Sequence, residues 1–403
     1  MSQTLTTIEK ALKENYLPAW NNQLGIEPTA LLGKIKKQSA KSDIIVAAAT
    51  VGLSGGFGFG AEGAATPASG NVRVQNFKTR TKDMYVNVVI SQKAVKLASG
   101  GGSIIDALQT EIDGAYKTAK WNVGRSLFGD GTGKLANVTG KSGTTAPVLT
   151  VNDTSKLKEG LIIDVYDITG SDPATLTNGT GRRIASVDKA NNQITLETGG
   201  SIGSWSSSAV DGVYGFVTVQ NSYEREITGL GAIFDDNIAT LYGVTKSTNP
   251  FIKPVVVDAG HDLDETVLTN ALMEAEDEKN SFVDTLLCGK NAYNQYVNYL
   301  RVNNVRVEEV SHTLKGGFKA IKFIVGSREV DVVYEKFVPT NEIWGVDSKT
   351  LTLYSTDWTF AELQGGGIFN LMEGKSVYRA LLTNYGELIC SNPGGCVRIT
   401  NCA

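Results

Sequence analysis

Residues 103–133 read SIIDALQTEIDGAYKTAKWNVGRSLFGDGTG, a helical pattern that runs into a glycine-rich turn. Apolar residues recur at intervals of three and four positions, and charged residues occupy the opposite face. Ser103 can cap the first turn, and Gly129 stands just past the last one. The pattern therefore predicts one helix over residues 103–128, about 39 Å long. A helix of that length is suited to be the spine of a domain.

The segments before this helix are predicted to extend away from any core of their own. Residues 5–17 form a short amphipathic helical pattern that Pro18 ends, and such a helix needs a partner surface to be stable. Ile44–Val51 and Tyr85–Ile90 are strand candidates on either side of a glycine-rich tip at residues 55–60. We therefore expect an arm followed by a long hairpin, and both should bury their apolar residues against something else.

The segments after the helix fall into three parts. Residues 146–220 contain five or six short alternating runs separated by turn residues, which predicts a small antiparallel β-barrel inserted into the chain. Residues 222–375 mix strands with two helices, and residues 376–403 are mostly strand. The predicted elements of these two parts are helices at 264–279 and 291–301 and strands at 305–310, 321–325, 330–334, 342–346, 351–354, 376–384 and 387–389.

Composition excludes several classes of function. The chain has 403 residues, is 41% hydrophobic and 20% charged, and carries a net charge of −4, which describes a soluble globular protein without a basic nucleic-acid footprint. It has only two histidines, His261 and His312, so most histidine-based catalysis is improbable. We expect neither a secretory signal nor a membrane span, since the longest uncharged stretch, 44–61, is rich in glycine in its second half.

Motifs for cofactors and catalysis are weak or missing. Residues 58–63 match G-x-G-x-x-G, but no helix follows to hold a pyrophosphate. There is no G-x-S-x-G or C-x2-C, although a spatial pair of catalytic carboxylates stays open. The predictions are no catalytic, cofactor-binding or metal-binding residues, no cofactor, and no enzyme. Cys390, Cys396 and Cys402 are expected to be reduced thiols, with a terminal or interchain disulfide as the alternative.

The 44 glycines instead suggest turns, flexible tips and close backbone approaches. Phe57 and Phe59 stand among glycines at the tip of the predicted hairpin. Aromatic anchors in such a loop fit insertion into a neighbouring chain. A solvent-exposed loop with scattered apolar residues fits these residues equally well.

Two strings resemble one family. Residues 61–69, AEGAATPAS, resemble the outgoing side of the extended loop in HK97-type major capsid proteins of tailed phages. Residues 129–133, GDGTG, resemble the turn that closes the long helix in the same family. The order of arm, loop, helix, turn and mixed domain also agrees. The resemblance implies an α+β, HK97-like fold with a small antiparallel β-barrel insertion.

The resemblance also implies a division into parts and a set of contacts between subunits. The implied parts are an N-terminal arm (1–45), an extended loop (46–92), a peripheral domain with the spine helix (93–145), the barrel (146–220), an axial domain (221–375) and C-terminal strands (376–403). The family's cross-linking lysine is replaced by Thr66, so that type of cross-link is not expected. The implied contact residues of the loop are Phe57, Phe59, Glu62, Pro67, Arg73, Lys78 and Arg80.

The implied function is that of a major capsid protein, which forms hexamers and pentamers and encloses double-stranded DNA without sequence specificity. The implied partners are further copies of the chain, a separate scaffolding protein, a portal and an optional decoration protein, with no membrane. The virion capsid is the implied location, after synthesis in the bacterial cytoplasm. Two alternatives are an encapsulin-type cellular compartment and a surface adhesin with a carbohydrate-binding barrel.

Overall fold

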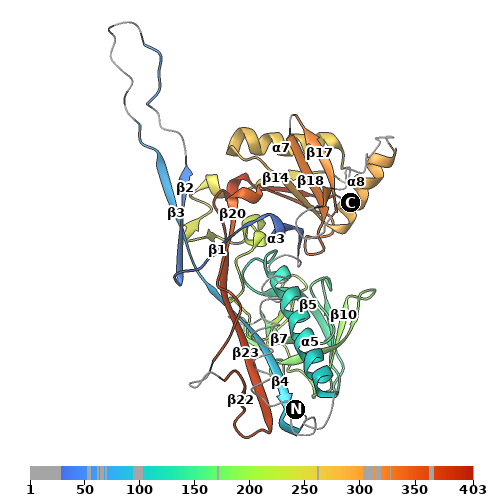
Figure 1. Ribbon diagram of the computed structural model, residues 1–403. Helices are drawn as coiled ribbons and strands as arrows, with labels where there is room; N and C mark the ends of the chain where they lie inside the picture. Colours follow the sequence, from blue (N-terminus) through green and yellow to red (C-terminus); the bar gives the residue numbers. More distant parts are fainter. Residues whose placement is uncertain are drawn as a thin grey trace. The chain divides into compact units, whose positions relative to one another are not determined.

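The structure is a computed structural model of the chain. It describes residues 29–51, 56–60, 63, 68, 70–93, 103–169, 172–260, 263–302, 312–313, 319–326, 328–362 and 367–402. The chain divides into two compact units. Figure 1 shows the chain coloured by residue number. We call Met1–Trp121 with Ile233–Ala403 the body, and Asn122–Ala232 the barrel unit. The predicted helix at 5–17 and the predicted strand at 305–310 lie outside the described residues.

One sheet of the body has seven strands in the order β14-β24-β19-β15-β18-β17-β16. Its central strand β15 (Thr285–Cys288) is buried at every position, because it lies between parallel β18 (Arg328–Tyr334) and antiparallel β19 (Ile343–Val346). An unbroken apolar run is typical of a strand that is covered on both faces. The remaining strands are β14 (Val255–Asp258), β16 (His312–Thr313), β17 (Lys319–Val325) and β24 (Val397–Thr400).

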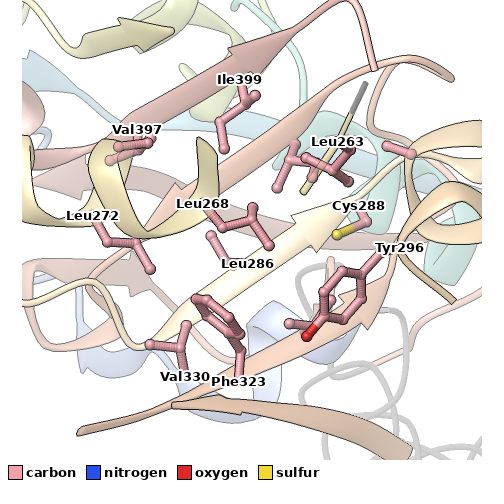
Figure 2. Packing of buried hydrophobic residues seen from close by; sticks show 14 of the residues in the cluster. Leu263, Leu268, Leu272, Leu286, Cys288, Tyr296, Phe323, Val330, Val397 and Ile399 are labelled. Atoms are coloured by element: carbon pink, nitrogen blue, oxygen red, sulfur yellow. The ribbon is translucent and has the colours of Figure 1, made fainter. Parts of the chain in front are cut away.

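Two helices supply side chains to the core of this sheet. They are α7 (Glu265–Lys279) and α8 (Lys290–Val302), which confirms the helices predicted at 264–279 and 291–301. Asp264 caps α7, since its side chain accepts a hydrogen bond from the Val267 amide at 2.8 Å. Figure 2 shows the buried cluster, which includes Leu268, Leu272, Leu286, Cys288, Tyr296, Phe323, Val330, Val397 and Ile399.

A second sheet of the body is built around the long strand β23 (Val377–Cys390). All of β4 (Lys82–Ser91) pairs antiparallel with β23, from Lys82 opposite Gly386 to Ser91 opposite Val377. The sequence predicted two strands here, at 376–384 and 387–389, and that division is wrong. The other strands are β1 (Lys36–Ser39), β20 (Leu351–Ser355), β21 (Thr359–Phe360) and β22 (Asn370–Leu371).

The start of the described chain is anchored to the body by a short helix, α3 (Ala30–Lys34). Lys34 forms an ion pair with Asp331 at 2.6 Å and donates to Thr285 Oγ1 at the same distance. The other short elements are α6 (Leu230–Phe234), the hairpin β12 (Thr240–Leu241) and β13 (Val244–Thr245), and the 3-10 turns at Pro250–Ile252, Ser348–Thr350 and Pro393–Gly395.

The barrel unit contains an antiparallel sheet that closes on itself. Its order is β11-β5-β6-β10-β9-β7-β8, and a further pairing of β11 with β7 completes the ring. Along β6 and β10, buried and half-buried positions alternate, as expected for strands with one face toward a core. The strands are β5 (Lys134–Ser142), β6 (Val148–Val151), β7 (Ile162–Asp167), β8 (Ala174–Thr175), β9 (Arg182–Asp188), β10 (Gln193–Leu196) and β11 (Gly215–Val219).

The first strand of this barrel, β5, precedes residue 146, where the sequence placed the start of the barrel. β5 has a weak strand pattern of its own. It is a strand because it pairs antiparallel with β11, where Gly215 is opposite Val138, and with β6. The helix predicted at 103–128 is present as α5 (Ser103–Ser126).

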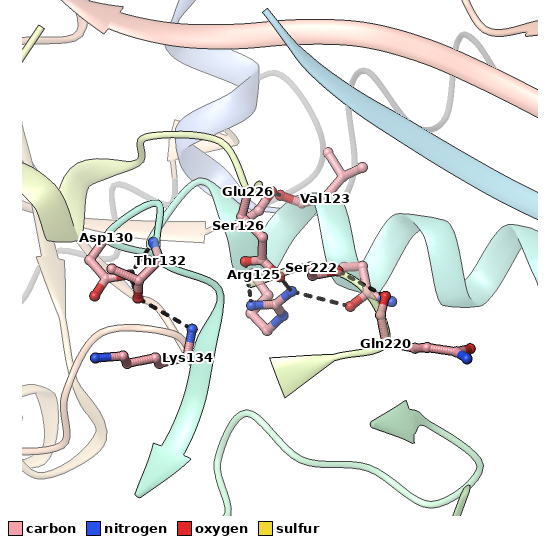
Figure 3. A network of polar contacts seen from close by, with 10 residues as sticks. Val123, Arg125, Ser126, Asp130, Thr132, Lys134, Gln220, Ser222 and Glu226 are labelled. Carbon is pink, nitrogen blue, oxygen red and sulfur yellow. Dashed lines mark hydrogen bonds and ion pairs between the residues drawn. The ribbon is translucent and has the colours of Figure 1, made fainter. Parts of the chain in front are cut away.

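The chain segments that lead into and out of the barrel are tied together, as Figure 3 shows. Arg125 and Glu226 form a double hydrogen-bonded ion pair with distances of 2.6 and 2.9 Å. Leu230 donates from its amide to the Leu127 carbonyl at 2.8 Å, and Glu224 donates to the Thr132 carbonyl at 2.8 Å. Gly133 has a φ of +78°, and a Cβ there would meet the Ser222 carbonyl oxygen at 2.5 Å, so a side chain would not fit. We call this paired region the neck.

Candidate functional site

The candidate site is a two-stranded hairpin formed by β2 (Ile44–Val51) and β3 (Arg73–Arg80). The strands pair antiparallel, from Ile44 opposite Arg80 to Val51 opposite Arg73. Among the described residues, no other strand joins this sheet. A lone two-stranded hairpin is marginally stable in water, so its two faces need to be covered. The β2 range predicted from the sequence is confirmed.

The inner face of the hairpin is covered by the body. Ile45, Ala49 and Phe77 are buried, and Phe77 retains only 1% of its exposure. The Phe77 ring lies 5.8 Å from the ring of Tyr242, in the turn between β12 and β13, and the Lys78 amide donates to the Tyr242 carbonyl at 2.9 Å. The Tyr242 hydroxyl in turn accepts from the Cys390 amide at 3.3 Å. These contacts fix the base of the hairpin to the end of β23.

The outer face of the hairpin is exposed and apolar. Ile44, Val46 and Val74 keep 49%, 52% and 56% of their exposure. Antiparallel register places them on one face, where Val46 is opposite Lys78 and Ile44 is opposite Arg80. We call this set, Ile44, Val46, Val74, Lys78 and Arg80, the outer face. Apolar side chains rimmed by charges are typical of a surface that contacts another protein.

The tip of the hairpin presents two aromatic rings. Phe57 and Phe59 keep 81% and 97% of their exposure, and their rings meet edge to face at 5.2 Å. They cover each other incompletely, so most of their apolar surface faces solvent in the isolated chain. Large exposed aromatic side chains are the residue type that anchors protein interfaces.

The charged residues expected at this site fall in different places. Lys78 and Arg80 are exposed on the outer face. Arg80 lies 3.9 Å from Asp43, and both side chains are largely in solvent, so this ion pair adds little stability. Arg73 begins β3. Glu62, Pro67 and Thr66 lie outside the described residues.

β4, which follows β3 after one residue, also exposes apolar side chains. Tyr85 and Val89 project from alternate positions of this strand and keep about half of their exposure (55% and 46%). The Tyr85 hydroxyl donates to Asp83 at 3.2 Å, and the desolvated phenol has a raised pKa. Sequence reasoning did not single out Ile44, Val46 and Val74, which the structure shows to be exposed. Residues 44–51 form a nearly continuous apolar run, so the sequence holds no alternation that could separate the exposed positions from the buried ones.

Two kinds of reactive group can be assessed in the described part of the chain, metal ligands and thiols. No group of three or more His, Cys, Asp or Glu residues there could hold a metal ion. All four cysteines are free and buried, and burial raises the pKa of Cys402 to about 12. A thiol with such a pKa is a poor nucleophile at neutral pH. No described helix is long and apolar enough to cross a membrane.

Comparisons with known proteins place this geometry in a structural class. No family model and no curated protein matches the sequence. Among solved structures, the capsid asymmetric unit of cyanophage A-1(L) matches with a TM-score of 0.55 and 12% identity, covering 93% of each chain. The chain therefore has the HK97-like fold of tailed-phage capsid proteins, as the resemblance implied.

Two further structures match with lower scores. One is from Mycobacterium phage Bobi, with a TM-score of 0.45, 10% identity and 98% of each chain covered. The other is the SrpI encapsulin of Synechococcus elongatus, with a TM-score of 0.43, 10% identity, and coverage of 91% of this chain and 85% of that one. These two TM-scores are too low to establish a shared fold by themselves.

Proposed function

We propose that the chain is the major capsid protein of a tailed bacteriophage and that it assembles with copies of itself into a closed shell. The observation that carries the proposal is the hairpin, whose outer face and tip expose apolar side chains that the described part of the same chain does not cover. A second copy is the partner that is always available to such a surface. The fold of a phage capsid protein supports this role.

The finer proposals follow from the family resemblance. The shell is icosahedral, is built of hexamers and pentamers, and encloses double-stranded DNA in the virion. The hairpin is the extended loop that lies over a neighbouring subunit, and the body comprises the peripheral and axial domains. The role is structural rather than enzymatic. A net charge of −4 supports a wall that does not bind the DNA tightly, because strong binding needs many basic phosphate contacts.

Further partners are proposed on the same basis. A separate scaffolding protein guides assembly, a portal occupies one vertex, and a decoration protein is an optional addition. The contact residues proposed for the extended loop are those of the sequence analysis: Phe57, Phe59, Glu62, Pro67, Arg73, Lys78 and Arg80.

The test introduces charge into the outer face. In the double variant Val46→Glu and Val74→Glu, we expect folded subunits that form no particles, because two carboxylates would have to be desolvated in every contact. The matched control is Val210→Glu in the barrel unit, where the side chain is equally exposed (55%). The measurement is the particle yield by negative-stain microscopy and size-exclusion chromatography, with any scaffolding protein co-expressed.

Two results would contradict the proposal. One is that the unmodified chain stays monomeric under every condition, with or without a scaffold. The other is that the double variant assembles as well as the control. Particles filled with a protein cargo rather than with DNA would instead identify an encapsulin-type compartment.

A further inference from the structure

The barrel unit contains a hollow that neither its fold nor the proposed assembly explains. Its volume is about 390 Å³, and it is lined by Tyr166, Asn221, Tyr223, Glu224 and Arg225. Pockets that hold small molecules in proteins measure roughly 300–1,000 Å³, so the hollow has room for a small ligand. Four of the five lining residues come from one loop that follows β11.

This loop is held by backbone hydrogen bonds, one of which goes to a buried carboxylate. Asp164, which is 1% exposed, accepts from the amides of Gly181 and Asn221, each at 2.8 Å. The Glu224 amide donates to the Thr132 carbonyl at 2.8 Å, and the Arg225 amide donates to the Ser222 carbonyl at 3.1 Å. The side chains around the hollow are therefore presented from a fixed backbone, which reduces the entropy lost when a ligand binds.

Two residues of the loop adopt a strained backbone conformation. Asn221 and Glu224 both have a φ of +58°, in the left-handed region. Asparagine tolerates this region, but for glutamate it is uncommon and costs of the order of 1 kcal/mol. Such conformations persist where the surroundings enforce them, and they concentrate at binding and catalytic sites. In this loop the strain places the two side chains on the rim of the hollow.

One wall of the hollow is aromatic. Tyr166 and Phe216 are opposite each other on β7 and β11, with stacked rings 5.0 Å apart. Tyr223 packs against both rings, at 4.9 and 5.1 Å, and the Lys134 ammonium lies 4.7 Å from the centre of the Phe216 ring. Both phenols are neutral at pH 7. Desolvation raises the pKa of Tyr223, and so does the Glu224 carboxylate, to which the Tyr223 hydroxyl hydrogen-bonds.

The chemistry of the lining defines the ligand class. Glu224 and Arg225 contribute one charge of each sign, so the hollow has no net charge that would attract a phosphate or a carboxylate ligand. The Tyr166 phenol and the Asn221 amide can each donate and accept hydrogen bonds. The Tyr223 hydroxyl, bonded to Glu224, can still accept, so the three groups match a ligand with hydroxyl groups. Tyrosine rings add an apolar surface for the C–H groups of a sugar ring. We propose that the barrel unit binds a neutral oligosaccharide at this hollow.

The experiment uses the full chain, labelled and unassembled, so that its outcome does not depend on whether the chain forms a shell. The probe is an array of neutral hexose and N-acetylhexosamine oligosaccharides, sialylated oligosaccharides and short oligonucleotides. We expect binding to at least one neutral oligosaccharide and none to the anionic probes. Calorimetric titration with the bound oligosaccharide then gives the dissociation constant.

Two variants remove polar groups without altering the backbone. Tyr223→Phe keeps the ring contacts and loses the hydroxyl, and Asn221→Gly keeps the left-handed conformation and loses the amide. Each is expected to weaken binding about tenfold, the effect of one lost hydrogen bond. The matched control is Asn192→Gly, at another exposed left-handed asparagine (φ of +51°) in the turn between β9 and β10, which should bind normally.

The proposal is overturned if no neutral oligosaccharide binds, if anionic probes bind instead, or if both hollow variants bind as tightly as the control. Circular dichroism spectra and melting temperatures of the variants establish that they are folded. Because Tyr223→Phe and Asn221→Gly perturb the site by different routes, a folding defect in one leaves the other as the test.

Discussion

Glu335 is a carboxylate buried in the body at 4% exposure. It accepts hydrogen bonds from the amides of Ala30, Lys336 and Phe337, and so it joins the start of α3 to the residues that follow β18. Burial raises its pKa to about 7, in spite of the nearby Lys336 ammonium and these hydrogen bonds. The protonated carboxyl is therefore the form that the fold prefers.

The consequence is a dependence of stability on pH. A carboxyl whose pKa is higher in the folded than in the unfolded chain stabilises the fold fully below the unfolded value of 4.5. That contribution is lost as the pH rises toward about 7, and it amounts to about 3 kcal/mol at most. In Glu335→Gln, this part of the pH dependence should disappear.

The measurement is the free energy of unfolding of both proteins by urea, at intervals between pH 4.5 and 8. The difference between variant and unmodified chain isolates Glu335 from other carboxylates such as Asp167, whose pKa is lowered to about 2 by hydrogen bonds that outweigh its burial. The variant should gain stability relative to the unmodified chain as the pH rises. A difference that stays constant over this range would show that Glu335 does not titrate there.

Arg125 and Glu226 form a second buried charged feature, with side chains 4% and 9% exposed. Removing one partner leaves an uncompensated buried charge, so Glu226→Leu should lower the free energy of unfolding of the barrel unit by about 3–5 kcal/mol. The double variant Arg125→Met with Glu226→Leu should recover most of that loss, because neither charge then remains. Hydrogen exchange of peptides from the barrel unit in increasing urea measures both. Equal losses in the single and double variants would contradict this account.

Among elements, the hairpin of β2 and β3 should be the part of the body that depends most on assembly. Its strands pair with no third strand among the described residues, and its outer face exposes Ile44, Val46 and Val74. In isolated subunits its backbone amides should therefore exchange rapidly with deuterium, whereas those of β15, buried on all sides, should exchange slowly.

In assembled particles the hairpin amides should become protected by at least about tenfold, if a neighbouring subunit covers the outer face. Hydrogen exchange with mass spectrometry on subunits and particles makes the comparison, and the β15 peptide serves as the internal control. Unchanged hairpin exchange after assembly would mean that another surface makes the contacts.

Elements with a strong local pattern could be predicted from the sequence. β2 is an apolar run, α7 and α8 have clear apolar periods, and the ranges of all three were predicted within two residues. The division of β23 failed because Gly386 weakens a strand locally. In the structure β20 and β4 both pair across it, and a Cβ at this position would lie 2.9 Å from the Tyr354 carbonyl oxygen. Residues 377–390 form one continuous strand because neighbouring strands pair with them, and the local sequence pattern holds no information about that pairing.

The candidate site could be predicted only in part. Phe57 and Phe59 were singled out because their surroundings are rich in glycine; the structure shows that they are exposed, and their contact with a neighbour stays a prediction. The anchor of Phe77 on Tyr242 was missed, because the two residues are brought together by the fold from distant positions in the chain. The same limit applies to the hollow in the barrel unit, where Tyr166 meets a loop more than fifty residues later.

At the scale of the whole molecule, the chain divides into units with different requirements. The body has a core of its own around β15, and the barrel closes its sheet into a ring, so it leaves few exposed strand edges. The hairpin of β2 and β3 has neither a core of its own nor a closed sheet. The fold is therefore that of a subunit whose two cores are complete and whose projecting strands are not.

The neck gives the barrel unit a property of its own. Leu127 and Leu230 are joined by a backbone hydrogen bond, and so are Thr132 and Glu224. The segment that enters the barrel therefore lies next to the segment that leaves it. Domains with neighbouring ends are the ones that chains accept as insertions. The neck is therefore an insertion site. We expect that residues 134–220 can be exchanged for a foreign domain with adjacent ends, so that the chain could carry that domain for display.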